Sequence, residues 1–466
     1  MDARSLKFIA KACGGELLNA SDAHSSVLAL RVCTDSRQAR AGDLFVALVG
    51  ERFDGHDFLR DVLKKGVAAV LVHRQKVSED FQNCAVIAVE DTRKALARLA
   101  AAYRKDFELP MVAVAGSNGK TTTKELLASV LRQKFVTLSS EASFNNDIGV
   151  PVTLLNLEEK HEAAVLEVGT NHPGELAPLV RSIQPQFGVI TSIGREHLEF
   201  FGDLAGVARE QGALAELLPR DGAIFINGDD EWTDQILART RARPVRLGLS
   251  EQNDWRLRSV RLDQQGARFC IEAPADFQEE YDGEYRINLI GRHQVFNGLF
   301  ALAVGASMGL SRSQLERGLA QARPAKMRLE VWELNGVRIL DDAYNANADS
   351  VLAALQTLRE LPCKGRRLAV LGDMAELGAQ SEAAHEEVGR RAAELGVGQL
   401  FAVGKMAPVM ARGARCAGLN RVLEFSEVET AATAIKSFVR TGDLLLVKAS
   451  RAARLERISE RLKAKC

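Results

Sequence analysis

Long apolar runs are absent from this chain of 466 residues. No stretch approaches the roughly 20 apolar residues that a membrane-spanning helix needs. Residues 1–7 also lack the apolar core of a secretory signal. These absences predict a soluble, unexported protein of the cytoplasm.

Paired cysteines and an excess of either charge are also lacking. The seven cysteines are scattered, odd in number and never spaced as C-x-x-C, which argues against a disulfide framework or a cysteine metal site. Lys plus Arg equals Asp plus Glu at 61 each. Because such a chain has no global field, we expect no nucleic-acid or membrane partner, and anionic ligands must be held by local sites. We expect the chain to act as a monomer.

The length predicts about three domains, and the order of elements divides the chain into α/β regions at 1–107, 108–322 and 323–466. The first region holds short β-like runs at 43–48, 67–73 and 85–89, and it ends in a helical pattern at 93–104.

In the central region, apolar runs alternate with helical stretches, which predicts a parallel sheet with ligands at the carboxyl ends of its strands. The runs lie at 163–168, 188–191 and 223–227. The third region repeats the alternation, and it reads as a Rossmann-like domain. It has no G-x-G-x-x-G, so a dinucleotide is not indicated.

The most informative segment is 111–123, where an apolar strand runs into a glycine turn that opens onto a helix. Gly116 and Gly119 allow a tight turn that aims backbone N–H groups inward, Lys120 can reach terminal phosphates, and the Thr121 hydroxyl can ligate Mg²⁺. The strict pattern G-x-x-x-x-G-K-[ST] would require glycine where the chain has Val114. The match is to the shorter core G-x-x-G-K-T, which predicts a nucleoside triphosphate site.

Other polar residues follow predicted strands. Glu167 and His197 suit one or two metal ions beside the phosphates, although a capped turn and a surface histidine would also explain them. Residues 341–347 suit ribose and phosphate hydroxyls, or equally an Asx turn with a helix cap. Ser36 and Arg37 form a plausible anion clamp, which turn chemistry alone would also explain.

Read together, these segments resemble the Mur ligase family over essentially the whole chain. The resemblance rests on segments 35–37, 42–48, 54–56, 116–122, 143–151, 167–169, 197–202, 341–347, 371–378 and 447–451.

The resemblance implies a cytoplasmic, ATP- and Mg²⁺-dependent step of peptidoglycan synthesis. In that step D-alanyl-D-alanine is joined to UDP-MurNAc-tripeptide through an acyl phosphate, giving UDP-MurNAc-pentapeptide, ADP and phosphate. Two alternatives stay open: another Mur-type amide ligase that adds an amino acid, and a non-catalytic relative that binds nucleotide. The implied domains bind the UDP substrate (1–107) and ATP (108–322), with a Rossmann-like domain closing over them (323–466).

The resemblance also implies a role for particular residues. The implied catalytic residues are Lys120, Glu167 and His197, and the implied metal ligands are Thr121, Glu167 and His197. The implied nucleotide contacts are Gly116, Ser117, Asn118, Gly119, Lys120, Thr121, Thr122, Asn297, Arg328 and Asp342. The implied substrate contacts are Ser36, Arg37, Asn145, Asn146, Thr170, Asn345, Asn347 and Asp373.

One position departs from the family pattern. Many members carry a lysine, carbamylated on its amine, a little after the histidine, where it helps to hold a second Mg²⁺. This chain has Gln211 at that place and no lysine from residue 161 to 325. Our hypothesis is that the Gln211 amide oxygen, or Glu210 after a shift, replaces the carbamate as a weaker ligand or through water.

Overall fold

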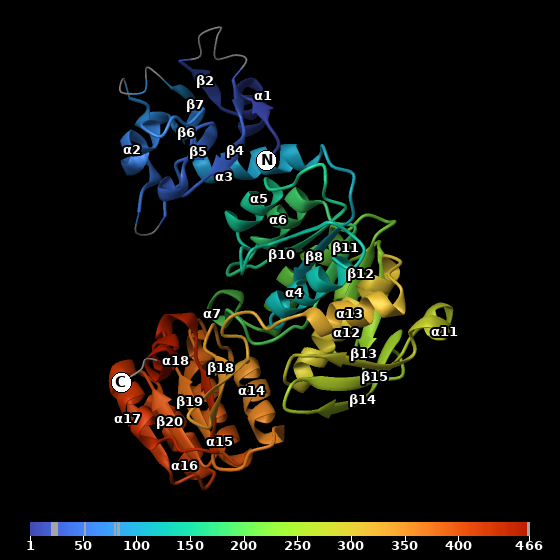
Figure 1. Ribbon diagram of the computed structural model, residues 1–466, viewed down its shortest axis with the longest axis vertical. Helices are drawn as coiled ribbons and strands as arrows, with labels where there is room; N and C mark the ends of the chain where they lie inside the picture. The colour runs from blue at the N-terminus through green and yellow to red at the C-terminus, as the bar shows by residue number, and fades with distance from the viewer. Residues whose placement is uncertain (20–26, 51–52, 79–80, 82–83, 464–466) are drawn as a thin grey trace. The chain divides into compact units, whose positions relative to one another are not determined.

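The computed structural model describes residues 1–19, 27–50, 53–78, 81 and 84–463. The chain forms two compact units (Figure 1). Unit 1 comprises 1–113, 135–170 and 175–186, and unit 2 comprises 114–134, 171–174 and 187–466.

Unit 1 contains a five-stranded sheet in the order β2-β7-β6-β5-β4. Strands β4 to β7 run parallel and β2 is antiparallel to β7. Its strands are β2 (Glu16–Leu18), β4 (Arg31–Cys33), β5 (Asp43–Val46), β6 (Ala69–His73) and β7 (Ala85–Val89). All five residues of β7 are buried, as expected for a central strand of a parallel sheet that is covered on both faces.

Unit 1 also has two short strand pairs and five α-helices. The pairs are β1 (Arg4–Ser5) with β3 (Leu28–Ala29), antiparallel, and β9 (Thr137–Ser139) with β10 (Ala163–Glu167), parallel. The helices are α1 (Leu6–Cys13), α2 (Leu59–Leu63), α3 (Thr92–Arg104), α5 (Gly149–Leu154) and α6 (Leu176–Ile183). Helix α3 begins where the Asp91 carboxylate accepts the Lys94 N–H, a side-chain N-cap.

In unit 2 the strands β11, β12 and β13 run parallel, which confirms the parallel sheet predicted for the central region. Beyond them β14, β15 and β16 pair antiparallel, an extension that the sequence reading missed. The strands are β11 (Phe187–Ile190), β12 (Ala223–Asn227), β13 (Arg243–Gly248), β14 (Trp255–Leu262), β15 (Ala267–Glu272) and β16 (Gly283–Ile287).

The helices of this part of unit 2 are α4 (Lys120–Leu131), α7 (Leu198–Phe201), α8 (Leu204–Gln211), α9 (Ala213–Glu216), α10 (Thr233–Leu237), α11 (Gln278–Tyr281), α12 (Arg292–Ser307) and α13 (Arg312–Gln321). Helix α12 is apolar around most of its circumference, because it packs against α4 on one side and against sheet strands on another. Strand β8 (Met111–Ala115) leads into α4, so the predicted strand, turn and helix are all present.

The C-terminal part of unit 2 is a six-stranded sheet in the order β17-β18-β22-β19-β20-β21. Strand β17 is antiparallel to β18, and the remaining pairs are parallel. The strands are β17 (Glu330–Leu334), β18 (Val337–Asp342), β19 (Arg367–Gly372), β20 (Gln399–Val403), β21 (Val422–Phe425) and β22 (Leu444–Lys448). The helices are α14 (Ala348–Glu360), α15 (Ser381–Glu394), α16 (Ala407–Cys416), α17 (Val428–Phe438) and α18 (Glu456–Lys463).

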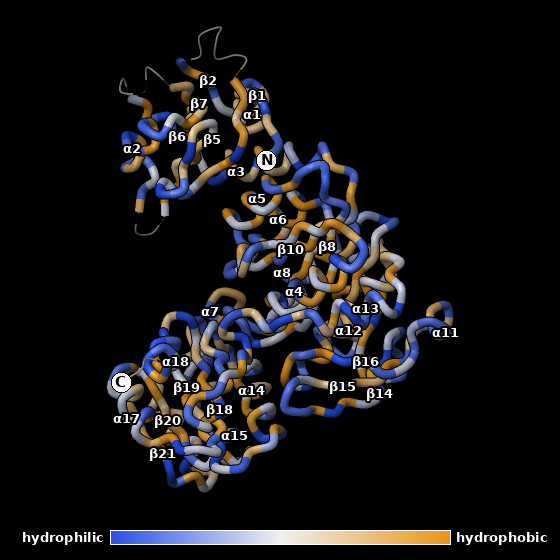
Figure 2. Tube along the Cα trace, in the orientation of Figure 1, coloured by the Kyte–Doolittle hydropathy of each residue, from blue (hydrophilic) through white to orange (hydrophobic). Residues whose placement is uncertain are grey.

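Alternate residues of these strands enter two separate cores. On β19, Ala369 and Leu371 pack in the core that includes α14, α15 and α16, whereas Leu368 and Val370 pack in the core that includes α17 and α18. Figure 2 shows the hydrophobic strands between these helices. Helices on both faces of a mostly parallel sheet define the predicted Rossmann-like domain.

Within the part of the chain that the structure describes, no helix is both long and apolar enough to cross a bilayer. The six cysteines among these residues are free thiols.

Candidate active site

The turn after β8 needs both of its glycines. Gly116 has φ +115°, and a Cβ there would collide with the Thr191 hydroxyl. Gly119 has φ +88°, and a Cβ there would lie 2.5 Å from Asn297 Oδ1. Since L side chains rarely adopt such backbone angles, the loop conformation depends on glycine at both positions. Such a turn into a helix N-terminus aims N–H groups at an anion.

Lys120, the first residue of α4, folds back over this loop. Its Nζ donates to Gly116 O at 2.5 Å and to Ser117 O at 3.3 Å, and it pairs with Glu196 Oε2 at 3.2 Å. Glu196 is only 6% exposed. The sequence reading passed over Glu196, because nothing in a lone glutamate between Arg195 and His197 signals a contact with residue 120.

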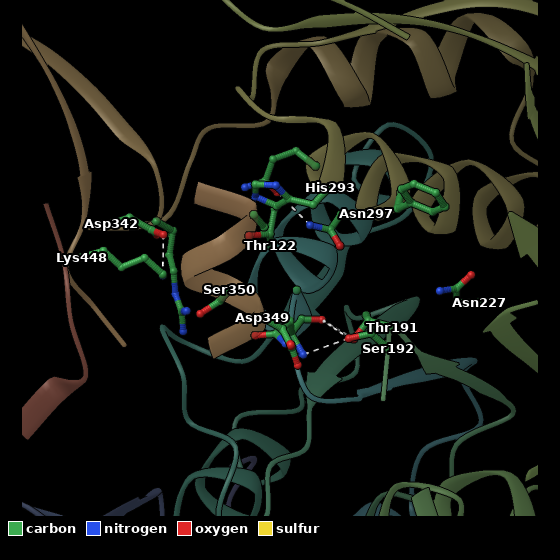
Figure 3. A pocket seen from close by; sticks show the side chains of 16 residues that line it. Thr122, Thr191, Ser192, Asn227, His293, Asn297, Asp342, Asp349, Ser350 and Lys448 are labelled. Atoms are coloured by element: carbon green, nitrogen blue, oxygen red, sulfur yellow. Dashed lines mark hydrogen bonds and ion pairs between the residues drawn. The ribbon is translucent and has the colours of Figure 1, made fainter. Parts of the chain in front are cut away.

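A cavity of about 290 Å³ opens beside the loop (Figure 3). Six of the ten residues predicted to contact nucleotide line it: Asn118, Gly119, Thr122, Asn297, Arg328 and Asp342. The other lining residues are Thr191, Ser192, Asn227, His293, Gln294, Phe296, Asp349, Ser350, Ala353 and Lys448. The phosphate loop, α12 and the C-terminal domain therefore share one cavity.

The α12 wall of this cavity is polar and neutral. Asn297 accepts from Thr123 Oγ1 at 3.1 Å and donates to Gln294 Oε1 at 2.8 Å. Burial lowers the pKa of His293 to about 4, so its imidazole is neutral at physiological pH. The spacing of positions 293, 294 and 297 on one helix face was the signal that could have found this wall from the sequence.

The C-terminal domain contributes charged groups. Lys448 Nζ lies 2.6 Å from Asp342 Oδ2, and burial lowers the pKa of this lysine. The Arg328 guanidinium lies 4.3 Å from the centre of the Tyr344 ring. Figure 3 shows Asp342 and Lys448 together on one side of the cavity. Positive groups here suit an anionic ligand held between the domains.

Contacts between the two domains of unit 2 surround the cavity. Asn347 Nδ2 donates to Asn118 Oδ1 at 3.0 Å. Arg195 donates to Asp349 Oδ1 at 2.8 Å and to Glu387 Oε2 at 2.6 Å. These bonds connect the C-terminal domain directly to the phosphate loop and to the loop after β11.

His197 is held by a carboxylate from the C-terminal domain. Its Nδ1 lies 2.5 Å from Glu376 Oε2, and this bond lowers the pKa of Glu376. Both residues adopt left-handed backbone angles, φ +48° and +60°. A histidine that ligates a metal commonly donates its other ring N–H to a carboxylate, which fixes the ring and leaves Nε2 for the metal.

The structure gives Gln211 a different place from the one we hypothesised. Its Oε1 accepts the Gly116 N–H at 2.9 Å, and its Nε2 donates to Glu196 Oε1 at 2.7 Å. Gln211 is 1% exposed. The amide oxygen thus contacts the phosphate loop. Glu210 Oε2 accepts the Gly174 N–H at 2.7 Å.

In unit 1, Glu167 ends β10 and is 1% exposed. Asn145 Nδ2 donates to Glu167 Oε1 at 2.8 Å, and Ser140 Oγ accepts the Glu167 backbone N–H. Among the described residues, no hydrogen-bond partner meets the buried Oε2. A buried carboxylate oxygen left in this way fits a metal ligand, because a buried polar atom without a partner is otherwise costly.

The remaining predicted substrate residues of unit 1 lie in turns. Ser36 and Arg37 begin a short 3₁₀ helix, and the paired Arg37 guanidinium lowers the pKa of Asp35 to about 2. Asn146 Oδ1 accepts the N–H groups of Ile148 and Gly149. Thr170 is buried.

In unit 2 the remaining predicted substrate residues lie near strand ends. The Asp373 carboxylate accepts the N–H groups of Lys405 and Met406, both at 2.9 Å. Asn345 Oδ1 accepts the Arg451 N–H at 3.3 Å. Both side chains thus stabilise loops at the carboxyl ends of the strands.

The fold and the cavity together define a nucleotide-binding α/β enzyme whose third domain completes the site. Three sequence profiles of one family match the chain: the Mur ligase family, catalytic domain (residues 31–104), the Mur ligase middle domain (114–305) and the Mur ligase, glutamate ligase domain (327–451). The chain belongs to the Mur ligase family.

Individual relatives match over nearly the full length. The UDP-N-acetylmuramoyl-tripeptide--D-alanyl-D-alanine ligase of Bacillus subtilis is 35% identical over 457 residues, which cover 98% of this chain and 97% of the relative. A crystal structure of MurF from Acinetobacter baumannii has a TM-score of 0.89 at 31% identity and covers 99% of both chains. The MurF ligase from Thermotoga maritima in complex with ADP has a TM-score of 0.80 at 29% identity, covering 93% of this chain and 96% of that one.

Proposed function

We propose that this chain is an ATP-dependent ligase that joins D-alanyl-D-alanine to the terminal carboxylate of UDP-MurNAc-tripeptide. The products are UDP-MurNAc-pentapeptide, ADP and phosphate. One observation carries the proposal: the phosphate loop and the C-terminal domain line a single cavity in a chain whose full-length relatives bear the name of this ligase. We propose that the reaction takes place in the cytoplasm, where ATP is available. We also propose that the protein acts as a monomer and binds neither nucleic acid nor membrane.

The first step activates the carboxylate. A carboxylate oxygen attacks the γ-phosphorus of ATP, and the bond from that phosphorus to ADP breaks, leaving an acyl phosphate. Lys120 is the cation of the phosphate loop, and its ammonium offsets the charge of two anions that must approach each other. Residues Gly116 to Thr122 would surround the phosphates, and the N–H groups at the start of α4 would donate to them, because the Gly116 N–H is already bonded to Gln211 Oε1. Asn297, Arg328 and Asp342 would hold the rest of the nucleotide.

Three residues are suited to hold Mg²⁺. In unit 2 we propose Thr121 and His197 as ligands, since Glu376 holds the His197 ring by its Nδ1. In unit 1 we propose Glu167, because its Oε2 is buried without a partner among the described residues. The ion would neutralise phosphate charge and polarise the phosphoryl oxygen.

The second step forms the amide. The amine of D-alanyl-D-alanine attacks the acyl carbon, the bond from that carbon to the phosphate oxygen breaks, and the amine loses a proton. We propose that residues 1–107, 108–322 and 323–466 act as UDP-binding, ATP-binding and closing domains. Exclusion of water by the closing domain would protect the acyl phosphate from hydrolysis.

The proposed substrate contacts divide between the two units. Those in unit 1 are Ser36, Arg37, Asn145, Asn146 and Thr170, and those in unit 2 are Asn345, Asn347 and Asp373.

The function is tested with purified protein, ATP, Mg²⁺, UDP-MurNAc-tripeptide and a panel of amines. We expect ADP release that requires both the acceptor and D-alanyl-D-alanine, with the pentapeptide detected by mass spectrometry. Faster turnover with a single amino acid would favour another Mur-type ligase. Nucleotide binding without any product would identify a non-catalytic relative, and either result contradicts the proposal.

Removal of bicarbonate provides a second prediction. Because residue 211 is glutamine and its amide is bonded to Gly116 and Glu196, no carbamate can form at this position. At fixed pH, turnover in degassed, bicarbonate-free buffer should equal turnover with added bicarbonate. A sharp and reversible loss of activity on bicarbonate removal would show that a carbamate forms elsewhere in the chain.

A further inference from the structure

Glu196 is a buried carboxylate of the phosphate-loop region whose chemistry the proposed reaction does not yet use. It lies in the loop after β11, and each of its oxygens has a partner: Oε2 pairs with Lys120 Nζ at 3.2 Å, and Oε1 accepts from Gln211 Nε2 at 2.7 Å. Glu196 therefore pairs with Lys120, the same cation that must bind the phosphates in the proposed reaction.

Gln211 fixes which oxygen of Glu196 is available. The Gly116 N–H can only donate, so it must face the amide oxygen of Gln211, and the amide NH₂ then faces Glu196. A donor at this position requires an acceptor, so the amide NH₂ of Gln211 holds Oε1 of Glu196. Only Oε2 is left to exchange partners.

The binding of phosphate changes the charge balance at Glu196. When the Lys120 ammonium turns to the phosphates, a carboxylate that is 6% exposed loses its cation and faces new anions. A buried charge without a partner is strongly unfavourable. A divalent metal ion that binds together with the nucleotide would replace the lost cation and offset the charge of the buried carboxylate.

The same design occurs independently in unit 1. There an amide NH₂, that of Asn145, holds one oxygen of Glu167 at 2.8 Å, and the other oxygen has no partner among the described residues. Each glutamate thus has one oxygen fixed by an amide donor. The other oxygen pairs with Lys120 in Glu196 and has no partner among the described residues in Glu167.

We propose that Glu196 is a further metal ligand of this chain. Its Oε2 binds a divalent cation of the nucleotide complex once Lys120 has moved to the phosphates, and Gln211 is the positioning residue that orients it. The inference rests on the proposed nucleotide-binding function, and it concerns residues of unit 2 alone.

The test measures nucleotide affinity with and without metal. Calorimetry with a non-hydrolysable ATP analogue gives the affinity in EDTA and in Mg²⁺, and their ratio is the gain due to the metal. For Glu196→Gln, we expect this gain to fall by about tenfold or more relative to the wild type, while the affinity in EDTA stays equal or rises because an anion near the phosphates is removed. The Mn²⁺ bound per chain in the presence of the analogue, counted by electron paramagnetic resonance, should fall as well.

Two further variants test the role of Gln211 and provide a control for the loss of a carboxylate. Gln211→Met removes the amide donor at similar length, together with the acceptor of the Gly116 N–H. The gain due to the metal, taken relative to the affinity of this variant in EDTA, should fall. Glu216→Gln is the matched control, because this glutamate of the neighbouring helix α9 pairs with Arg239, and it should keep the wild-type gain.

Two results would overturn the inference. In the first, Glu196→Gln keeps the full gain, so that Glu196 acts only on Lys120. In the second, Glu216→Gln loses the gain equally, so that any loss of a carboxylate in this region has this effect. A wild-type protein that binds no analogue at all would instead refute the proposed function, and the inference with it.

Discussion

Substitution of Lys120 by methionine is expected to reduce pentapeptide formation by a factor on the order of 10²–10³, the loss typical when one preorganised charge or donor leaves a transition state. The Lys120 ammonium lies over the phosphate loop, within reach of Gly116 O and Ser117 O. Methionine keeps the length of the side chain but removes the charge. Steady-state kinetics should show the loss mainly in kcat, because the charge acts on the phosphoryl group in transfer.

Lys124 provides the matched control for this prediction. It lies one turn further along the same helix, is fully buried and pairs with Glu125. Lys124→Met also removes a buried ammonium, so thermal unfolding of the two variants compares the structural cost. We expect Lys124→Met to retain kcat within about threefold. The role of Lys120 is wrong if Lys120→Met keeps more than a tenth of wild-type activity, or if both variants lose activity alike.

The second large effect is expected at Glu167, where activity and stability should change in opposite directions. Glu167→Gln removes a charge whose Oε2 is buried without a partner among the described residues. The folded protein should gain about 1 kcal/mol without metal, or roughly 1 °C in Tm for cooperative unfolding of a chain of 466 residues. Turnover should fall by about 10²-fold, and the Mg²⁺ concentration for half-maximal rate should rise, because a metal ligand is lost.

Substitution of Asn145 should cause a smaller loss of activity than substitution of Glu167. It donates to Glu167 Oε1, so Asn145→Ala should cost about tenfold in activity, the range seen when a residue that orients a ligand is removed. Glu162, an exposed glutamate of unit 1 that accepts the Val136 N–H, is the control for loss of a carboxylate. A Glu167→Gln variant with normal Mg²⁺ dependence, or with reduced stability, would contradict the assignment of Glu167 to the metal.

Much of the fold could be predicted because the strands of its parallel sheets are apolar and lie between amphipathic helices. The predicted run 223–227 coincides with β12, and 85–89 with β7. The antiparallel strands β14 to β16 were missed. Strand β14, with sequence WRLRSVRL, alternates buried and exposed residues and is rich in arginine, so local composition did not mark it as part of the central sheet.

The parts of the site that lie in one short segment could be predicted from the sequence. The contacts between side chains far apart in the sequence could not. The phosphate loop is a local motif, and its two glycines lie at the backbone angles that the motif requires. The bonds of Gln211 to Gly116 and to Glu196 join three different elements. Sequence spacing contains no signal for such a pairing, which is why the substitution at 211 suggested a metal ligand and not these two hydrogen bonds.

The transfer of oxygen from carboxylate to phosphate tests the central claim most directly. UDP-MurNAc-tripeptide is prepared with both oxygens of its terminal carboxylate labelled with ¹⁸O and is turned over with unlabelled ATP and D-alanyl-D-alanine. If an acyl phosphate forms, each released phosphate carries one ¹⁸O and the new amide carbonyl carries the other. Unlabelled phosphate in the presence of product, or ¹⁸O recovered in AMP, would contradict activation of the carboxylate by the γ-phosphoryl group.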